Sequence, residues 1–166
     1  MEGGDRLLWR IMRREPESIA AVEVFYETHS TTIDNESGIG TGWLPGKLSE
    51  NGREQARALG ERRRGDDIAA VFVSDRARAV ETAEIAFGGS DVPIYQDARL
   101  RKCDYGVMNG MSVAQLAAGR YRHVDEPWPQ GQSYRQVVAQ ARDFLRDLAT
   151  GWDDRTVVVI AHSAKG

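Results

Sequence analysis

The sequence is poor in cysteine and has no long apolar run. Its 166 residues contain one cysteine, Cys103, which cannot form an internal disulfide, so a reducing, cytoplasmic setting is expected. Arginines interrupt the apolar residues near the N-terminus, which excludes a signal-peptide core and a membrane span there. With a net charge of −3 and a pI of about 5.7, no nucleic-acid partner is expected.

Several motifs that carry catalysis in other proteins are also absent. The sequence has no H-E-x-x-H or paired-cysteine pattern for zinc, no G-x-x-x-x-G-K-[ST] phosphate loop and no G-x-S-x-G nucleophile elbow. A cysteine-based phosphatase loop would need an arginine six residues after Cys103, where the chain has Asn109. These classes of site therefore have no support in the sequence.

Apolar segments alternate with amphipathic ones along the rest of the chain. Strands are expected over residues 20–26, 68–74, 92–95 and 156–161, and helices over 49–64, 75–87, 113–119 and 133–150. Strands that alternate with helices favour a mostly parallel sheet with helices on both faces. The prediction is a single α/β domain, a three-layer sandwich, over residues 19–166.

Polar side chains follow three of the expected strands. His29 comes after the first strand, Arg78 after the second and His162 after the last. A lone histidine in such a position is usually an ordinary loop residue, but the carboxyl ends of strands in an open α/β sheet meet at one crevice. Two imidazoles and a guanidinium suit phosphoryl transfer, because imidazole can attack phosphorus and arginine binds phosphate oxygens.

Eight segments, in order, resemble motifs of the histidine phosphatase (phosphoglycerate-mutase-like) superfamily. Residues 24–32, VFYETHSTT, resemble the strand and R-H-G-x-[ST] opening, and residues 74–83 resemble S-x-L-x-R-A-x-x-T-A. The other matches are Asn35, Thr41-Gly42-Trp43, residues 48–56, Arg99-Leu100 with 104–110, residues 131–133 and residues 157–163. The resemblance covers about residues 20–166 and implies a phosphoglycerate-mutase-like fold.

The resemblance also implies roles for particular residues. His29 would attack phosphorus, and His162 and Arg78 would stabilise the transferred group. The expected phosphate-binding residues are Arg78, Asn35, Thr41, Gly42, Thr28 and Ser30. The family needs no metal or organic cofactor, and its substrates are phosphorylated small molecules or phosphorylated side chains. The short chain favours a phosphatase over a mutase, and the stretch 102–131 would set specificity.

The chain departs from the family pattern at the expected site. Thr28 replaces an arginine, Ser30 and Ser163 replace glycines, and Lys102 replaces the glutamate that serves as general acid. Losing one charged phosphate donor should cost about 1.5–3 kcal/mol of binding energy. Lys102 could substitute for the missing positive charge, and Asp104 could act as the acid. The alternative is a degenerate domain that binds a phosphorylated ligand or a protein partner without turnover.

The two ends of the chain give a further expectation. Residues 1–18 are expected to form an extension, in which Leu7, Leu8, Ile11 and Met12 share one face of a short basic helix. Such a helix could pack on the domain or a partner, form a disordered leader, or lie on a membrane surface. Family members continue into a helix after His162, whereas this chain stops at Gly166. The last strand would then be covered by the extension or by a second subunit in a homodimer, or remain an exposed patch.

Overall fold

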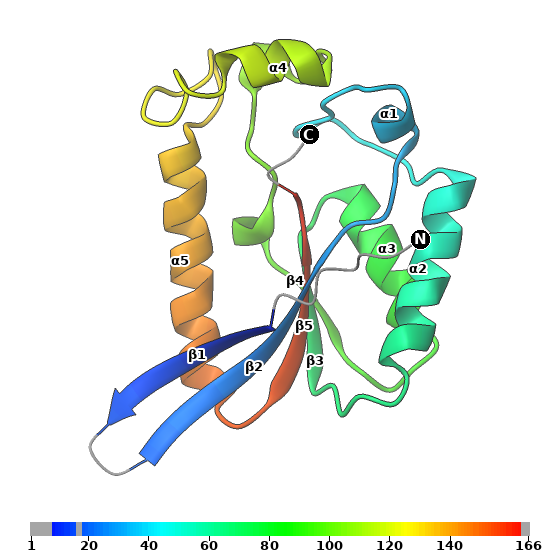
Figure 1. Cartoon of the computed structure of the whole chain (residues 1–166), viewed down its shortest axis with the longest axis vertical. Helices are drawn as coiled ribbons and strands as arrows, with labels where there is room; N and C mark the ends of the chain where they lie inside the picture. Colours follow the sequence, from blue (N-terminus) through cyan, green and yellow to red (C-terminus); the bar gives the residue numbers. More distant parts are fainter. Residues whose placement is uncertain (1–7, 16–17, 164–166) are drawn as a thin grey trace.

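Five strands form one sheet in the computed structural model, which describes residues 8–15 and 18–163 (Figure 1). The strands are β1 (Leu8–Glu15), β2 (Ser18–Thr28), β3 (Ala70–Val73), β4 (Ile94–Gln96) and β5 (Thr156–Ala161). Their order is β1-β2-β5-β3-β4, and only β1 runs antiparallel to its neighbour. The predicted mostly parallel α/β sandwich is confirmed.

Helices cover both faces of this sheet (Figure 1). They are α1 (Ile33–Glu36), α2 (Glu50–Arg63), α3 (Ala77–Phe87), α4 (Val113–Gly119) and α5 (Tyr134–Gly151), with two short 3-10 turns at Ala98–Leu100 and Gly106–Met108. Helices α2 and α3 lie on one face and α5 on the other, while α4 lies beyond the carboxyl ends of the strands. Within the described residues, no helix combines the length and the apolar character needed to cross a bilayer.

Serine and threonine side chains fix where several helices begin. Ser49 caps α2 by accepting a hydrogen bond from the amide of Gly52. Ser112 and Ser133 open α4 and α5 with capping boxes, in which a glutamine three residues on closes the reciprocal bond. These helix starts agree with the prediction. Helix α1 is an addition, because no helix was predicted between the strand over residues 20–26 and the helix over 49–64.

The central strand β5 is buried on both of its faces. Val157, Val159 and Ala161 pack with Phe144 and Leu148 of α5. The residues between them, Val158 and Ile160, pack against α2 and α3. Successive side chains of a strand point to opposite faces, so an apolar residue is needed at every position. The expectation of an uncovered apolar strip on this strand is therefore wrong, because helices of the domain itself cover it.

The N-terminal segment is a strand and not the expected helix. Strand β1 pairs with β2 along its whole length, from Leu8 opposite Phe25 to Glu15 opposite Ser18. An edge strand carries unpaired backbone donors and acceptors, and a second strand satisfies them where a helix would not. Leu7 lies outside the described residues. The division into an extension over 1–18 and a domain over 19–166 stays a prediction.

Replacing Phe144 should test how much the α5 contact stabilises the fold. Phe144 is 3% exposed, so Phe144→Ala should lower the free energy of unfolding by about 3–5 kcal/mol. The neighbouring Leu145 is 41% exposed, and Leu145→Ala should change it by no more than about 0.5 kcal/mol. Urea unfolding of both variants measures the difference. Equal losses would show that α5 does not pack as described.

Candidate active site

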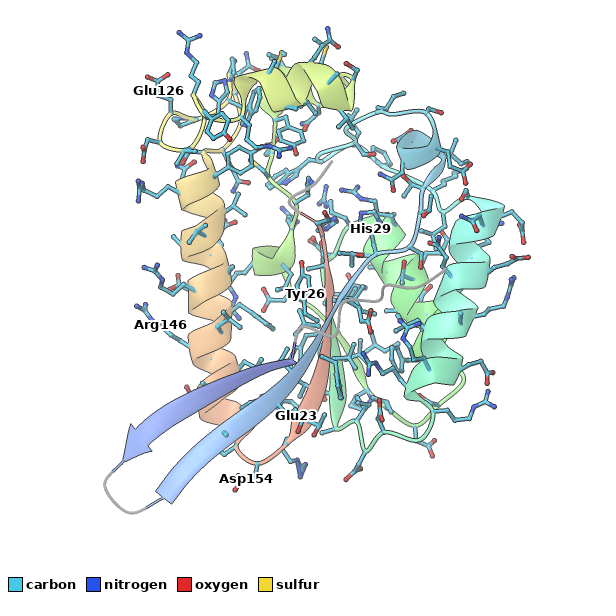
Figure 2. The ribbon with its side chains drawn as sticks, in the orientation of Figure 1. Glu23, Tyr26, His29, Glu126, Arg146 and Asp154 are labelled. Carbon is cyan, nitrogen blue, oxygen red and sulfur yellow. The ribbon has the colours of Figure 1, made fainter. Side chains whose placement is uncertain are left out.

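A backbone hydrogen bond joins the ends of β2 and β5, the strands that precede His29 and His162. The parallel pairing of β2 with β5 sets Thr28 opposite Ala161, and the amide of His29 donates to the carbonyl of Ala161 at 2.9 Å. The imidazole rings of His29 and His162 follow directly, with centroids 5.0 Å apart. Figure 2 shows His29 at the end of β2 nearer α1, beyond Tyr26 on the same strand. The structure thus brings the two predicted histidines together.

A cavity of about 220 Å³ opens beside His29. It is lined by Thr28, His29, Thr31, Asn35, Ile39, Gly40, Thr41, Gly42, Arg78, Lys102 and Ser163. Most of the residues predicted to bind phosphate therefore share one cavity. His162 lines the neighbouring cavity towards α5 instead, and Ser30 and Asp104 line neither of these two.

Hydrogen bonding fixes the tautomer of His29. Its Nδ1 lies 2.8 Å from the carbonyl oxygen of Ser30, which can only accept, so Nδ1 must carry the proton. Burial lowers the pKa of His29 to about 4, and the positive charges of Arg78 and Lys102 add to this, while the Ser30 carbonyl opposes it. The ring is therefore neutral near pH 7, and its Nε2 keeps an electron pair for attack.

Arg78 is held in place by carbonyl groups and by His162. Its Nη2 donates to the carbonyl of Gly42 at 2.9 Å and lies 3.4 Å from Nδ1 of His162. Since a guanidinium only donates, Nδ1 accepts and the opposite nitrogen, Nε2, donates to Oγ of Ser74 at 2.8 Å. Burial, followed by the charge of Arg78, lowers the pKa of His162 far below its ordinary value. Neutral His162 thus helps to orient Arg78.

The loop after His29 is shaped by short polar contacts. The hydroxyl of Thr41 donates to Asp34, so Thr41 can offer the cavity only its backbone amide as a donor. The side-chain oxygen of Asn35 accepts from the amide of Thr32, which leaves the NH₂ end to donate to a ligand. Gly42 has a φ of +54°, and a Cβ there would lie 1.9 Å from Oδ1 of Asn109. Only glycine fits this position.

Lys102 and Asp104 have different surroundings. The ammonium of Lys102 donates to the carbonyl of Ser163 at 2.6 Å on the cavity wall. Oδ1 of Asp104 accepts from the amide of Gly106 and from Nδ2 of Asn109. Asp104 therefore stabilises a turn, and the structure does not bring it to the cavity as the sequence-based hypothesis of an acid required.

Thr82 and Tyr26 support the site, although the sequence analysis gave them no role. The hydroxyl of Thr82 accepts from the amide of Ser30 and donates to the carbonyl of Arg78, so it joins the turn after His29 to α3. The hydroxyl of Tyr26 donates to the carbonyl of His162. Both are hydroxyls on buried faces of regular elements, and hydrophobic periodicity does not distinguish them from packing residues.

Cys103 is buried and takes no part in this chemistry. Burial raises the pKa of its thiol to about 12, so the sulfur stays protonated and is a poor nucleophile. This agrees with the absence of a cysteine-phosphatase loop in the sequence.

Residues 28–165 match the histidine phosphatase superfamily (branch 1), and the chain belongs to this family. A 2,3-bisphosphoglycerate-dependent phosphoglycerate mutase of Staphylococcus epidermidis is 27% identical over 174 positions, which take in 81% of this chain and 76% of the mutase. Phosphoserine phosphatase 1 of Hydrogenobacter thermophilus is 25% identical over 151 positions, covering 86% of this chain and 71% of the phosphatase.

Solved structures show the same similarity. YhfR of Bacillus stearothermophilus superposes with a TM-score of 0.76 at 31% identity, over 86% of this chain and 74% of its own. A mycobacterial glucosyl-3-phosphoglycerate phosphatase in complex with VO₃ superposes with a TM-score of 0.71 at 30% identity, over 82% of this chain and 74% of its own. The family thus includes both phosphatase and mutase relatives of this chain.

The protonation state of His29 can be checked by NMR titration. The side-chain ¹⁵N signals of His29 should titrate with a midpoint near pH 4, against about 6.5 for an unperturbed imidazole. Between these values the unfolded chain binds a proton that the folded chain does not, so this histidine lowers stability as the pH falls through that window. The variant His29→Asn assigns the signal. A midpoint near 6.5 would contradict desolvation of this imidazole.

Proposed function

We propose that the protein hydrolyses a phosphomonoester, on a small molecule or a protein side chain, through a phosphohistidine on His29. Nε2 of His29 attacks phosphorus, and water then hydrolyses the phosphohistidine. Arg78 binds the transferred oxygens, with Asn35 and the backbone at Thr41 and Gly42 as further donors. The observation that carries the proposal is a neutral, partly buried imidazole that shares a cavity with two cations.

The charges around the cavity suit a phosphate dianion. Arg78 and Lys102 line it, and no aspartate or glutamate is among the lining residues in the described part of the chain. Burial lowers the pKa of Arg78 to about 10, which still leaves the guanidinium charged at neutral pH. Asp34, which bonds Thr41 behind the cavity wall, is the carboxylate that acts on Arg78, and a bound phosphoryl group would add the negative charge that the lining residues do not supply.

Inserted residues distinguish the staphylococcal mutase from this chain and favour a phosphatase over a mutase of that type. The alignment with the staphylococcal mutase runs over 174 positions yet takes in only 81% of this 166-residue chain, so the mutase carries inserted residues. The alignment with the Hydrogenobacter phosphatase runs over 151 positions and takes in 86% of the chain, with far fewer insertions. A mutase must retain its phosphorylated intermediate, and additional covering segments serve that purpose by excluding water.

Turnover should depend on His29 and need no added metal. His29→Ala should lower hydrolysis of p-nitrophenyl phosphate by at least about 10³-fold, since it removes the nucleophile of a covalent route. The matched control is His123→Ala, because His123 stacks on Trp128 in a different part of the molecule. The assay is run with and without a chelator. Activity that a chelator abolishes and a divalent ion restores would overturn the mechanism, and full activity of His29→Ala would do the same.

Vanadate should bind in the cavity and raise the melting temperature. A ligand at 100 times its Kd stabilises the folded state by about 2.7 kcal/mol. Arg78→Ala should remove most of this shift, and the exposed Arg57 provides the control, Arg57→Ala. An unchanged shift in Arg78→Ala would place the anion elsewhere. A normal shift without turnover of any phosphomonoester would favour the degenerate binding domain over the phosphatase.

A further inference from the structure

An alcohol that leaves phosphorus must take up a proton, and the cavity contains few groups that can give one. Its side chains with exchangeable protons are Thr28, Thr31, Asn35, Thr41, His29, Arg78, Lys102 and Ser163. Hydroxyl and amide protons are too weakly acidic for this role, and His29 is occupied as the nucleophile. The choice is therefore between the guanidinium of Arg78 and the ammonium of Lys102.

The nearby carboxylates are hydrogen-bond acceptors in other contacts. Asp34 accepts the hydroxyl proton of Thr41. Asp104 accepts from the amide of Gly106 and from Asn109. Asp75 pairs with Arg101, and the hydrogen bond from this arginine lowers the pKa of the carboxyl. None of these carboxylates lines the cavity, so none is placed to protonate a leaving oxygen there.

Lys102 lines the cavity, and its backbone is held by its neighbours. Its carbonyl accepts a hydrogen bond from Nε1 of Trp43 at 2.8 Å. The Trp43 ring makes cation–π contacts with two guanidinium groups, that of Arg101 at 4.6 Å from the ring centroid and that of Arg76 at 5.3 Å. The next residue, Cys103, is buried. The backbone at Lys102 is therefore fixed, while Nζ, with one described bond to Ser163, has further donors for a ligand.

We infer that Lys102 is the general acid of this site: its ammonium protonates the leaving oxygen as Nε2 of His29 displaces it. This inference rests on the proposed function. In the first step the N–P bond forms, the P–O bond to the alcohol breaks, and a proton moves from Nζ to the alcohol oxygen. The lysine is left as a neutral amine beside the phosphohistidine.

The second step returns the proton. Water attacks phosphorus, the neutral amine of Lys102 takes a proton from it, and the N–P bond breaks, with its electron pair going back to Nε2 of His29. Phosphate leaves, and the ammonium is restored. No metal, oxidant or second substrate is needed for this balance.

Burial and the charges around Lys102 lower its pKa, which favours proton transfer. Burial is the main cause that lowers its pKa to about 8, and the positive charges of Arg78 and Arg120 add to it, while Cys103 acts in the opposite direction. The charge of Lys102 in turn helps to lower the pKa values of His29 and His162. An ammonium with a pKa near the working pH gives up its proton far more readily than Arg78.

Leaving-group dependence distinguishes an acid from a simple phosphate-binding cation. β-Glycerophosphate releases an alkoxide that needs a proton, whereas p-nitrophenyl phosphate releases a stable anion that does not. Lys102→Arg keeps the charge but not a transferable proton. It should lower kcat/KM, which reports formation of the phosphohistidine and not its hydrolysis, by about 10²–10⁴-fold for β-glycerophosphate and by less than about tenfold for p-nitrophenyl phosphate. The control, Lys47→Met, changes the exposed lysine of the loop before α2.

The pH profile gives a second readout. In the native enzyme, kcat/KM for β-glycerophosphate should fall as the pH rises above about 8, because the ammonium loses its proton there. The fall should be absent for p-nitrophenyl phosphate. Equal losses of kcat/KM on both substrates in Lys102→Arg, or unchanged kcat/KM on both, would overturn the inference and leave Lys102 as a binding cation or a bystander. If native enzyme turns over neither substrate, the proposed function itself fails, which the His29→Ala assay detects separately.

Discussion

The parallel register of β2 against β5 is the constraint on which the candidate site depends. With Thr28 opposite Ala161, both strands end at the same level, and the residues that follow them are His29 and His162. A slip by one residue would turn one imidazole to the opposite face of the sheet. The register is held by a buried strand whose side chains alternate between two apolar clusters, so packing on both faces opposes any slip. The chemistry of the site is thus secured by the core beneath it.

Much of the fold could be predicted because local patterns and tertiary packing agree. The apolar run of β5 and the 3.6-residue period of α5 each admit one interpretation, and both elements were placed within about a residue. Because the carboxyl ends of parallel strands meet at one edge of the sheet, His29, Arg78 and His162 were predicted to lie together. In the structure His162 contacts both His29 and Arg78. Motif resemblance added Asn35, Thr41 and Gly42, which line the same cavity.

The failures have a common physical cause, since they concern pairings that neither hydrophobic periodicity nor motif spacing reveals. The residues of β1 suit a short amphipathic helix when considered alone, but the open edge of β2 pairs with them as a strand. Asp104 is near Lys102 in the sequence, yet its carboxylate is held by Gly106 and Asn109. The hydroxyls of Thr82 and Tyr26 support the site only through hydrogen bonds with backbone groups that the fold brings to them. Spacing along the chain does not encode such pairings.

The contacts of Asn109 connect Asp104 to the cavity without any contact to a ligand. Asp104 holds Nδ2 of Asn109, whose Oδ1 accepts from the amide of Trp43, directly after Gly42. Gly42 in turn supplies the carbonyl that binds Arg78. A genetic screen for lost activity would therefore recover substitutions at Asp104 and Asn109 alongside those at the histidines. Such a screen would not distinguish residues that position the loop from residues that take part in the reaction. A measurement of how well the loop is ordered in each variant would separate the two groups.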